Sequence, residues 1–196
     1  MPAIPSTLES LTMAVVVEDA AAVLGFWFGE VPPDKRFAKD PVLDRVIEER
    51  FGALREAVLA SDADGWRDSP DRLLAAIILL DQFSRNIFRG SGRAFAADPL
   101  ARSLTLQAFD RGWEDRYAHE QLRFLYLPLA HAEDIEMQAL SVARYEALGD
   151  PEALRAAREH AEVVRLYGRF PSRNAALARP STPAEISYLR ETTHRW

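Results

Sequence analysis

Five dipeptides in the chain place a proline directly after a residue that can cap a helix: Asp40-Pro41, Ser69-Pro70, Asp98-Pro99, Asp150-Pro151 and Thr182-Pro183. The side chain of a capping residue accepts a hydrogen bond from an unpaired N–H group of the first helical turn. Proline at the first helical position loses no bond, because its nitrogen would have had no partner. Glu185 adds the reciprocal half of a capping box to the fifth pair. Five such signals in 196 residues predict an all-helical chain.

The apolar residues between these pairs recur at helical spacing. We expect helices over residues 42–58, 100–112, 122–129, 135–148 and 154–167, and a short final helix around Ile186 and Leu189. Gly149 and Gly168 follow two of these segments, where a left-handed residue commonly ends a helix. No alternating segment bounded by turn signals predicts a strand. The expected fold is all-α, with about seven to nine helices packed as antiparallel hairpins in a right-handed, tetratricopeptide-like array.

Composition excludes several classes of function. The net charge of −6 makes phosphate-rich nucleic acid an unfavourable partner. The absence of cysteine excludes disulfides, thiol catalysis and thiolate metal sites, and it agrees with a cytoplasmic location. The longest apolar run, Leu73–Leu80, is too short to span a bilayer, so no membrane association is expected. We expect residues 1–13 to form a disordered extension and residues 14–196 a single helical domain.

The apolar run Leu73–Leu80 gives way abruptly to a polar turn. A helix that is apolar on every face is buried on all sides, so the turn that follows enters the interior. If the helix continues, Asp81 and Arg85 lie one turn apart on one face, and Gln82 and Asn86 share the next. Two interpretations stay open: the turn clamps the fold, or it lines a ligand pocket.

A tripeptide within this turn occurs twice, as Ser84-Arg85-Asn86 and as Ser172-Arg173-Asn174. Arginine presents a rigid fork of donors, and asparagine offers both donors and acceptors. Capping a helix does not require the same tripeptide twice. The repetition therefore favours one polar site, built where the fold brings the two copies together.

A second apolar segment ends in the same manner, at His131, Glu133 and Asp134. A carboxylate beside an imidazole can orient a general base or a metal-ligating histidine. The two acids can equally be first-turn residues that the dipole of the next helix favours. No HExxH spacing supports a metal site, and no GxSxG elbow supports a nucleophile built from Ser84 or Ser172. We expect neither a metal nor a cofactor.

Five motifs in order resemble one bacterial family, catalogued as domain of unknown function 924, over about residues 16–190: Leu24–Gly29, Leu80–Gly90, Phe124–Pro128, His131-x-Glu133-Asp134 and Arg169–Asn174. The resemblance implies a tetratricopeptide-like helical fold and carries no activity. The family usually has proline at the position of Ser84 and histidine at that of Ser172, which argues against a mechanism centred on position 172. The two Arg-Asn pairs match the family pattern.

The first functional hypothesis is a polar pocket for a small anionic molecule, in a protein that could be an enzyme. Arg85 and Arg173 would hold the anion, and Asn86 and Asn174 would orient it. Asp81 and His131 are the weak candidates for proton transfer. The full set of candidate ligand-binding residues is Asp81, Gln82, Arg85, Asn86, His131, Glu133, Asp134, Arg169, Arg173 and Asn174. The alternative hypothesis is a scaffold that binds a protein or peptide, with purely structural polar motifs.

Overall fold

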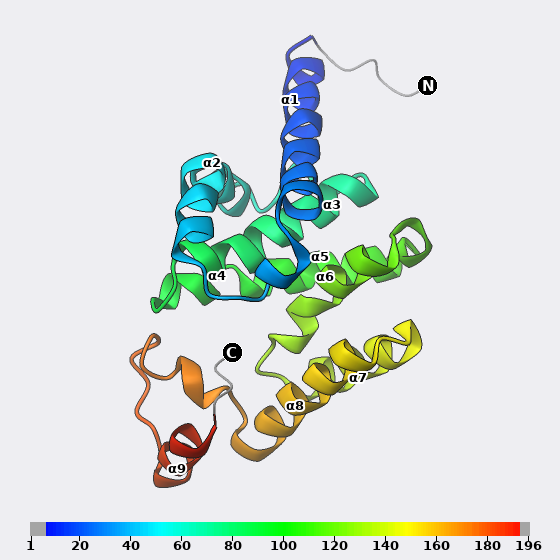
Figure 1. Ribbon diagram of the computed structural model, residues 1–196. Coiled ribbons are helices and arrows are strands. Elements are labelled where there is room, and N and C mark those ends of the chain that lie inside the picture. Colours follow the sequence, from blue (N-terminus) through cyan, green and yellow to red (C-terminus); the bar gives the residue numbers. More distant parts are fainter. Residues whose placement is uncertain (1–6, 193–196) are drawn as a thin grey trace.

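The computed structural model describes residues 7–192, with the backbone alone for residues 7–14 (Figure 1). Its α-helices are α1 (Thr7–Leu24), α2 (Pro41–Ala60), α3 (Pro70–Ile77), α4 (Ser84–Ile87), α5 (Asp98–Asp110), α6 (His119–Ala130), α7 (Ile135–Leu148), α8 (Pro151–Tyr167) and α9 (Pro183–Glu191). Short π-helical and 3-10 turns join them: η1 (Gly25–Glu30), η2 (Pro33–Lys35), η3 (Ile78–Phe83), η4 (Gly92–Phe95), η5 (Glu114–Arg116) and η6 (Pro171–Arg173). The part of the chain that is described contains no strand, and the predicted all-α class is confirmed.

The helices pack mainly on their neighbours in the chain. Helix α1 contacts α3, α2 contacts η3 and α4, and α3 also contacts α5 and α6. Helices α7 and α8 form an adjacent pair that extends from α6 (Figure 1). The segment with η6 and α9 follows α8 and brings residues near 176 back to η4. The tetratricopeptide-like order of this array stays a prediction.

Four of the five predicted cap-proline signals form helix caps. Asp40, Ser69, Asp150 and Thr182 each accept a hydrogen bond from a backbone N–H group of the following turn. The prediction for Asp98 was wrong: α5 begins at Asp98 itself, after Ala97, and no side chain caps it. The carboxylate of Asp98 binds two arginines instead, and a charge-assisted bond to a buried arginine outweighs a cap.

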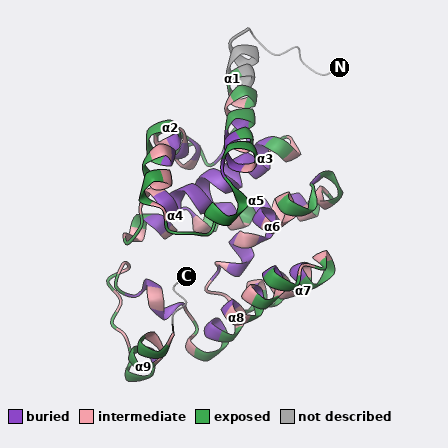
Figure 2. Cartoon of the chain, in the orientation of Figure 1, coloured by how far each residue is buried: buried purple, intermediate pink, exposed green. Residues whose placement is uncertain are grey.

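The core centres on the apolar run that the sequence marks as buried. Every residue of Leu73–Leu80 is at most 1% exposed, which places the end of α3 and the start of η3 inside the molecule (Figure 2). The ring of Phe83 packs edge-on against Trp27, with centroids 5.4 Å apart, and Trp27 packs in the same way against Phe124. Phe26 and Trp27, which follow α1, are therefore core, and the polar residues of η3, Asp81 and Gln82, are buried as well.

The structure tests two further expectations, on the N-terminal extension and on membrane association, only in part. Helix α1 begins at Thr7, inside the extension expected for residues 1–13, and residues 1–6 lie outside the described residues. The division into an extension and one domain over residues 14–196 stays a prediction. No helix within the described residues has the length and apolar character needed to cross a membrane.

The contact between η4 and the C-terminal segment can be tested at Gly92. A Cβ atom there would lie 3.0 Å from the carbonyl oxygen of Ala176 and 3.4 Å from Leu177. We expect Gly92→Ala to lower the free energy of unfolding by about 1–3 kcal/mol, because backbone atoms cannot yield as a side chain can. Gly52→Ala, in helix α2 with no atom closer than 3.8 Å, is the control and should stabilise by about 0.5–1 kcal/mol. Equal thermal melts for the two variants would contradict this close contact.

Candidate functional site

Asp81 lies in η3, a π-helical turn between α3 and α4. Such turns are rare and occur frequently at functional sites. Its carboxylate is 2% exposed and lies 3.0 Å from Nη1 of Arg85, so the predicted Asp81–Arg85 ion pair forms. Arg85 Nη1 also donates to the backbone carbonyl of Asp81 at 2.9 Å. The polar turn is thus held by its own arginine at the edge of the core.

Asp98 joins the two copies of the repeated tripeptide. Arg85 donates to both of its carboxylate oxygens, at 2.9 and 3.0 Å. Arg173 of η6 donates from Nη1 to Oδ2 of the same carboxylate at 3.3 Å. Because both arginines reach one oxygen, the two guanidinium groups are near neighbours, although their residues are 88 positions apart in the sequence.

His131 follows the last residue of α6 and completes this cluster. Its Nδ1 atom lies 2.7 Å from Oδ1 of Asp81. Burial raises the pKa of Asp81, but the charge of Arg85 and the interaction with His131 outweigh burial and hold that pKa below its usual range. Burial and the charge of Arg85 lower the pKa of His131, against the opposing effect of Asp81. At neutral pH an ionised carboxylate therefore faces a neutral imidazole.

Arg173 is the incompletely paired member of the cluster. Its side chain is 4% exposed, yet no described residue accepts a hydrogen bond from its buried Nε and Nη2 atoms. The guanidinium carbon lies over the rings of Phe95 and Phe170, 4.6 and 4.5 Å from their centroids. Burial, and then the charge of Arg85, lower the pKa of Arg173 to about 10, so the group stays charged at neutral pH. A buried cation with two unused donors requires an explanation.

His160 of α8 forms part of the wall beside these residues. Its ring centroid lies 6.0 Å from that of His131 and 5.6 Å from that of Phe170. Its Nδ1 atom lies 2.6 Å from the carbonyl oxygen of Ala156, which can only accept, so Nδ1 is the protonated nitrogen. Burial, and then the nearby His131, lower the pKa of His160 to about 3. The imidazole is neutral in the folded protein.

The remaining residues of the two tripeptides and of their flanks bind other parts of the protein. The Asn86 amide donates to Asp44 at 2.7 Å, and the Asn174 amide donates to Ser181 at 3.0 Å. Gln82 donates to Asp81 at 2.5 Å, so it supports the cluster from one side. Gln82 and Asn86 were predicted to share a helix face, but no hydrogen bond joins them in the described structure.

The acids after His131 do not contact its imidazole. Asp134 caps α7 by accepting from the N–H groups of Glu136 and Met137, because the helix breaks between Ala130 and Ile135. Asp134 therefore has a structural role as the N-cap of α7, and the carboxylate partner of His131 is Asp81.

Two ion pairs hold the chain that carries Arg173. The Glu133 carboxylate accepts from both terminal nitrogens of Arg179, at 2.6 and 2.8 Å, and from the backbone N–H of Phe170. Arg169 binds both carboxylate oxygens of Glu185, at 2.7 and 2.9 Å. Arg169 and Arg179 lie on either side of Arg173 in the sequence, and their ion pairs fasten its segment to α9 and to the α6–α7 turn.

Sequence reasoning missed the role of Asp98 and did not place His160 near the site. The Asp98-Pro99 pair has the local pattern of a cap, so no local signal distinguishes it from the four true caps. The proximity of His160 to His131 depends on how α8 folds back along α7 and α6. Within the described residues, no three histidine, aspartate or glutamate side chains converge as metal ligands would.

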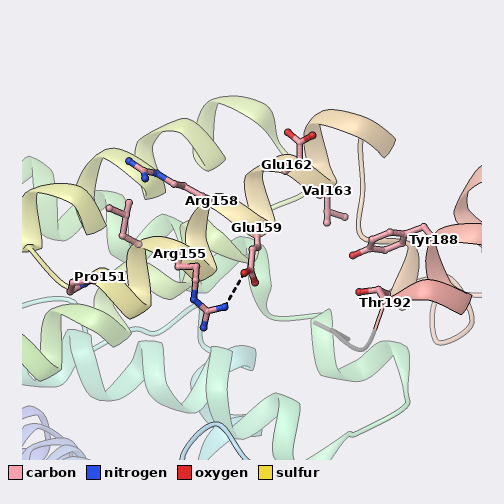
Figure 3. Close-up of a pocket in the computed structure, with 9 residues that line it drawn as sticks. Pro151, Arg155, Arg158, Glu159, Glu162, Val163, Tyr188 and Thr192 are labelled. Atoms are coloured by element: carbon pink, nitrogen blue, oxygen red, sulfur yellow. Dashed lines mark hydrogen bonds and ion pairs between the residues drawn. The ribbon is translucent and has the colours of Figure 1, made fainter.

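A separate groove of about 590 Å³ lies between α8 and α9 (Figure 3). Leu154, Val163 and Tyr188 contribute apolar surface, and the Arg155–Glu159 ion pair, 3.0 Å long, crosses its wall. None of the predicted site residues lines it. The groove and the arginine cluster therefore share no residue.

Residues 23–193 match the family described as bacterial protein of unknown function (DUF924). The chain belongs to this family. A solved structure of a protein of unknown function, ATU0120 from Agrobacterium tumefaciens, is similar to it with 38% sequence identity and a TM-score of 0.86. The similarity covers 90% of this chain and 99% of that one. No curated protein matches the chain. Membership in the family supports the helical fold and leaves the function to be argued from the site.

The cluster makes opposite predictions for its two arginines. Arg85→Met leaves the buried carboxylate of Asp81 and the partly buried carboxylate of Asp98 without their main cation, which costs about 3–5 kcal/mol, or roughly 10 °C in melting temperature for a chain of this size. Arg173→Met removes a half-paired buried cation and keeps apolar contact with Phe95 and Phe170. We expect its melting temperature to equal or exceed that of the wild type. A loss as large as that of Arg85→Met would make Arg173 a structural clamp instead.

His160 should make the stability depend on pH. Its pKa is about 3 in the folded protein and about 6.5 in the unfolded chain. The unfolded state therefore binds more protons between these values, and stability falls as the pH drops below about 6.5, by about 1.4 kcal/mol per pH unit for this group. Denaturant unfolding of His160→Gln should show a shallower decline between pH 6.5 and pH 4. Parallel profiles for variant and wild type would refute the assignment.

Proposed function

We propose that the protein binds a small anionic molecule, a carboxylate or a phosphate, on the Nε–Nη2 edge of Arg173. The observation that carries this proposal is the pair of buried donors on that edge, which no described residue uses. These two N–H groups point in the same direction and form the fork that binds a carboxylate or phosphate in a bidentate manner. A buried donor without a partner costs about 1–3 kcal/mol, so an anion that satisfies both donors regains that energy.

Arg85 has a supporting role in this proposal. Its terminal nitrogens already bind both oxygens of Asp98 and the carboxylate of Asp81. Both carboxylates raise the pKa of Arg85, against the effect of burial, and its charge is well compensated. Its charge still adds to the attraction for an anion, because Arg85 and Arg173 share Asp98. Of the two repeated arginines, Arg85 therefore organises the site and Arg173 binds the anion.

The flanking residues support the binding arginine. Glu133 and Glu185 hold the chain around Arg173 through Arg179 and Arg169. Because both open donors of Arg173 are shielded from solvent, a ligand reaches them only when this segment shifts. Asn86 and Asn174 donate to Asp44 and Ser181, and we assign them no direct ligand contact. Asp81 and His131 are the groups available for proton transfer next to the anion.

The proposal is tested by following the arginine Nε–H signals in ¹H–¹⁵N spectra during titration with sodium acetate and with inorganic phosphate. We expect the Arg173 signal to shift in a saturable manner with at least one of them, since its Nε–H gains an acceptor. Arg173→Gln should abolish saturable binding in calorimetry. Arg165→Gln, on the exposed face of α8 and paired only with Glu162, is the matched control and should bind normally. If neither anion shifts the Arg173 signal, its donors are satisfied by water and the proposal is wrong.

The scaffold hypothesis rests on a different part of the molecule. The groove between α8 and α9 is open along one side and has an apolar floor, as a docking site for a peptide requires (Figure 3). Its lining excludes both tripeptides. Substitutions in the groove can therefore be made without changing a residue of the arginine cluster.

A further inference from the structure

Five side chains form one continuous polar chain across the site. It runs from His131 through Asp81, Arg85 and Asp98 to Arg173, with successive contacts of 2.7, 3.0, 2.9 and 3.3 Å. The three inner members are charged and each meets an opposite charge or a donor on both sides. Within the described residues, the buried Nε–Nη2 edge of Arg173 at one end has no acceptor, and at the other end His131 is bound through Nδ1, which leaves Nε2 for a further partner.

The end at His131 is a hydrogen-bond acceptor. Asp81 is an ionised carboxylate, which accepts only, so the Nδ1 atom of His131 must carry the proton that lies between them. The imidazole is neutral, since burial and the nearby arginines lower its pKa. The hydrogen-bond network therefore assigns a lone pair to Nε2. One end of the polar chain donates two hydrogen bonds, and the other accepts one.

Both ends border the same aromatic wall. Phe170 lies against the guanidinium carbon of Arg173 at 4.5 Å, and its ring centroid is 5.6 Å from that of His160. The His160 ring lies 6.0 Å from that of His131. The charge of Arg173 also contributes to the lowered pKa of His131 and of His160. The two ends therefore lie along one wall, with Arg173 close enough to His131 for its charge to act on the imidazole.

The charges of the cluster favour a ligand with one negative charge. Arg85 and Arg173 are balanced by Asp81 and Asp98, and the neighbouring Arg179 is paired with Glu133. A carboxylate adds a single charge beside the under-compensated Arg173. A phosphate dianion would add two, close to Asp98, which already lies 3.3 Å from Arg173. The planar carboxylate also matches a guanidinium that is packed on the faces of two aromatic rings.

The His131 end of the polar chain determines which second functional group the ligand carries beside its carboxylate. Nε2 of His131 needs a partner that brings a proton, and either a hydroxyl or an amine could supply one. An amine is a cation at neutral pH, and two arginines surround this position, so a neutral hydroxyl is favoured. We propose that the ligand of this site is a small hydroxy monocarboxylate, with its carboxylate on Arg173 and its hydroxyl donating to Nε2 of His131. This inference rests on the proposed function and names the chemical class of its ligand.

The experiment compares matched acids by isothermal titration calorimetry at pH 7.5: lactate with propionate, and 3-hydroxybutyrate with butyrate. The two pairs differ in the spacing between carboxylate and hydroxyl. We expect the hydroxy acid of at least one pair to bind about tenfold more tightly, the equivalent of one net hydrogen bond. In His131→Asn the amide can still donate to Asp81 but has no atom at the Nε2 position. The ratio should fall to about one there.

A measurement on the unmodified protein covers the case in which His131→Asn fails to fold. The ¹⁵N shift of Nε2 of His131 should move when the favoured hydroxy acid is added and stay constant with its simple counterpart. Arg173→Gln should lose affinity for both acids of each pair.

The outcomes separate this inference from the function on which it rests. Equal affinities within both pairs, with Arg173-dependent binding, would overturn the hydroxyl contact and leave the anion site intact. Discrimination that persists in His131→Asn would place the acceptor elsewhere and overturn it as well. If no carboxylate and no phosphate binds, the proposed function fails and the inference fails with it.

Discussion

The carboxylate of Asp98 is the contact on which the rest of the site depends. It receives both terminal nitrogens of Arg85 and one of Arg173, and so it links the N-terminal helices to the segment that follows α8. Without it, two buried guanidinium groups would repel each other, and the C-terminal segment would lose an anchor. Because Arg85 takes both oxygens, Asp98 compensates Arg173 only in part. The partial compensation leaves the open donor edge that we assign to a ligand.

Stability and binding make opposite demands on this cluster. A fully satisfied network of buried charges is neutral or mildly favourable for folding, whereas an unsatisfied member destabilises the protein. Asp81, Arg85 and Asp98 form a satisfied network, whereas Arg173 is an unsatisfied member. A ligand that accepts from both donors of Arg173 would remove this cost. The two histidines contribute to both properties. Protonating a neutral imidazole beside the arginines would destabilise the protein, and at neutral pH each imidazole offers a lone pair.

The polar residues illustrate which parts of a site can be inferred from local sequence. The Asp81–Arg85 pair was predictable because both residues lie on one helical segment, where spacing determines contact. The pairing of His131 with Asp81 was not, since they are 50 positions apart and the nearer Asp134 offered a plausible partner. Asp98 carried the local pattern of a cap, and that pattern was overridden by the two arginines that fold against it. Asn86 and Asn174 are bound by Asp44 and Ser181, which no motif connects to them.

The sequence by itself determined helices such as α2, α7 and α8, four helix caps, two glycine stops and the buried apolar run, because these depend on residues within a few positions of one another. It also singled out the two arginines as a pair. The tertiary structure alone decided that one carboxylate would join them, that Arg85 would be satisfied and that Arg173 would keep two donors open. Those outcomes depend on the contact of η6 with α5, and long-range packing sets the distances between charges that local patterns leave undefined.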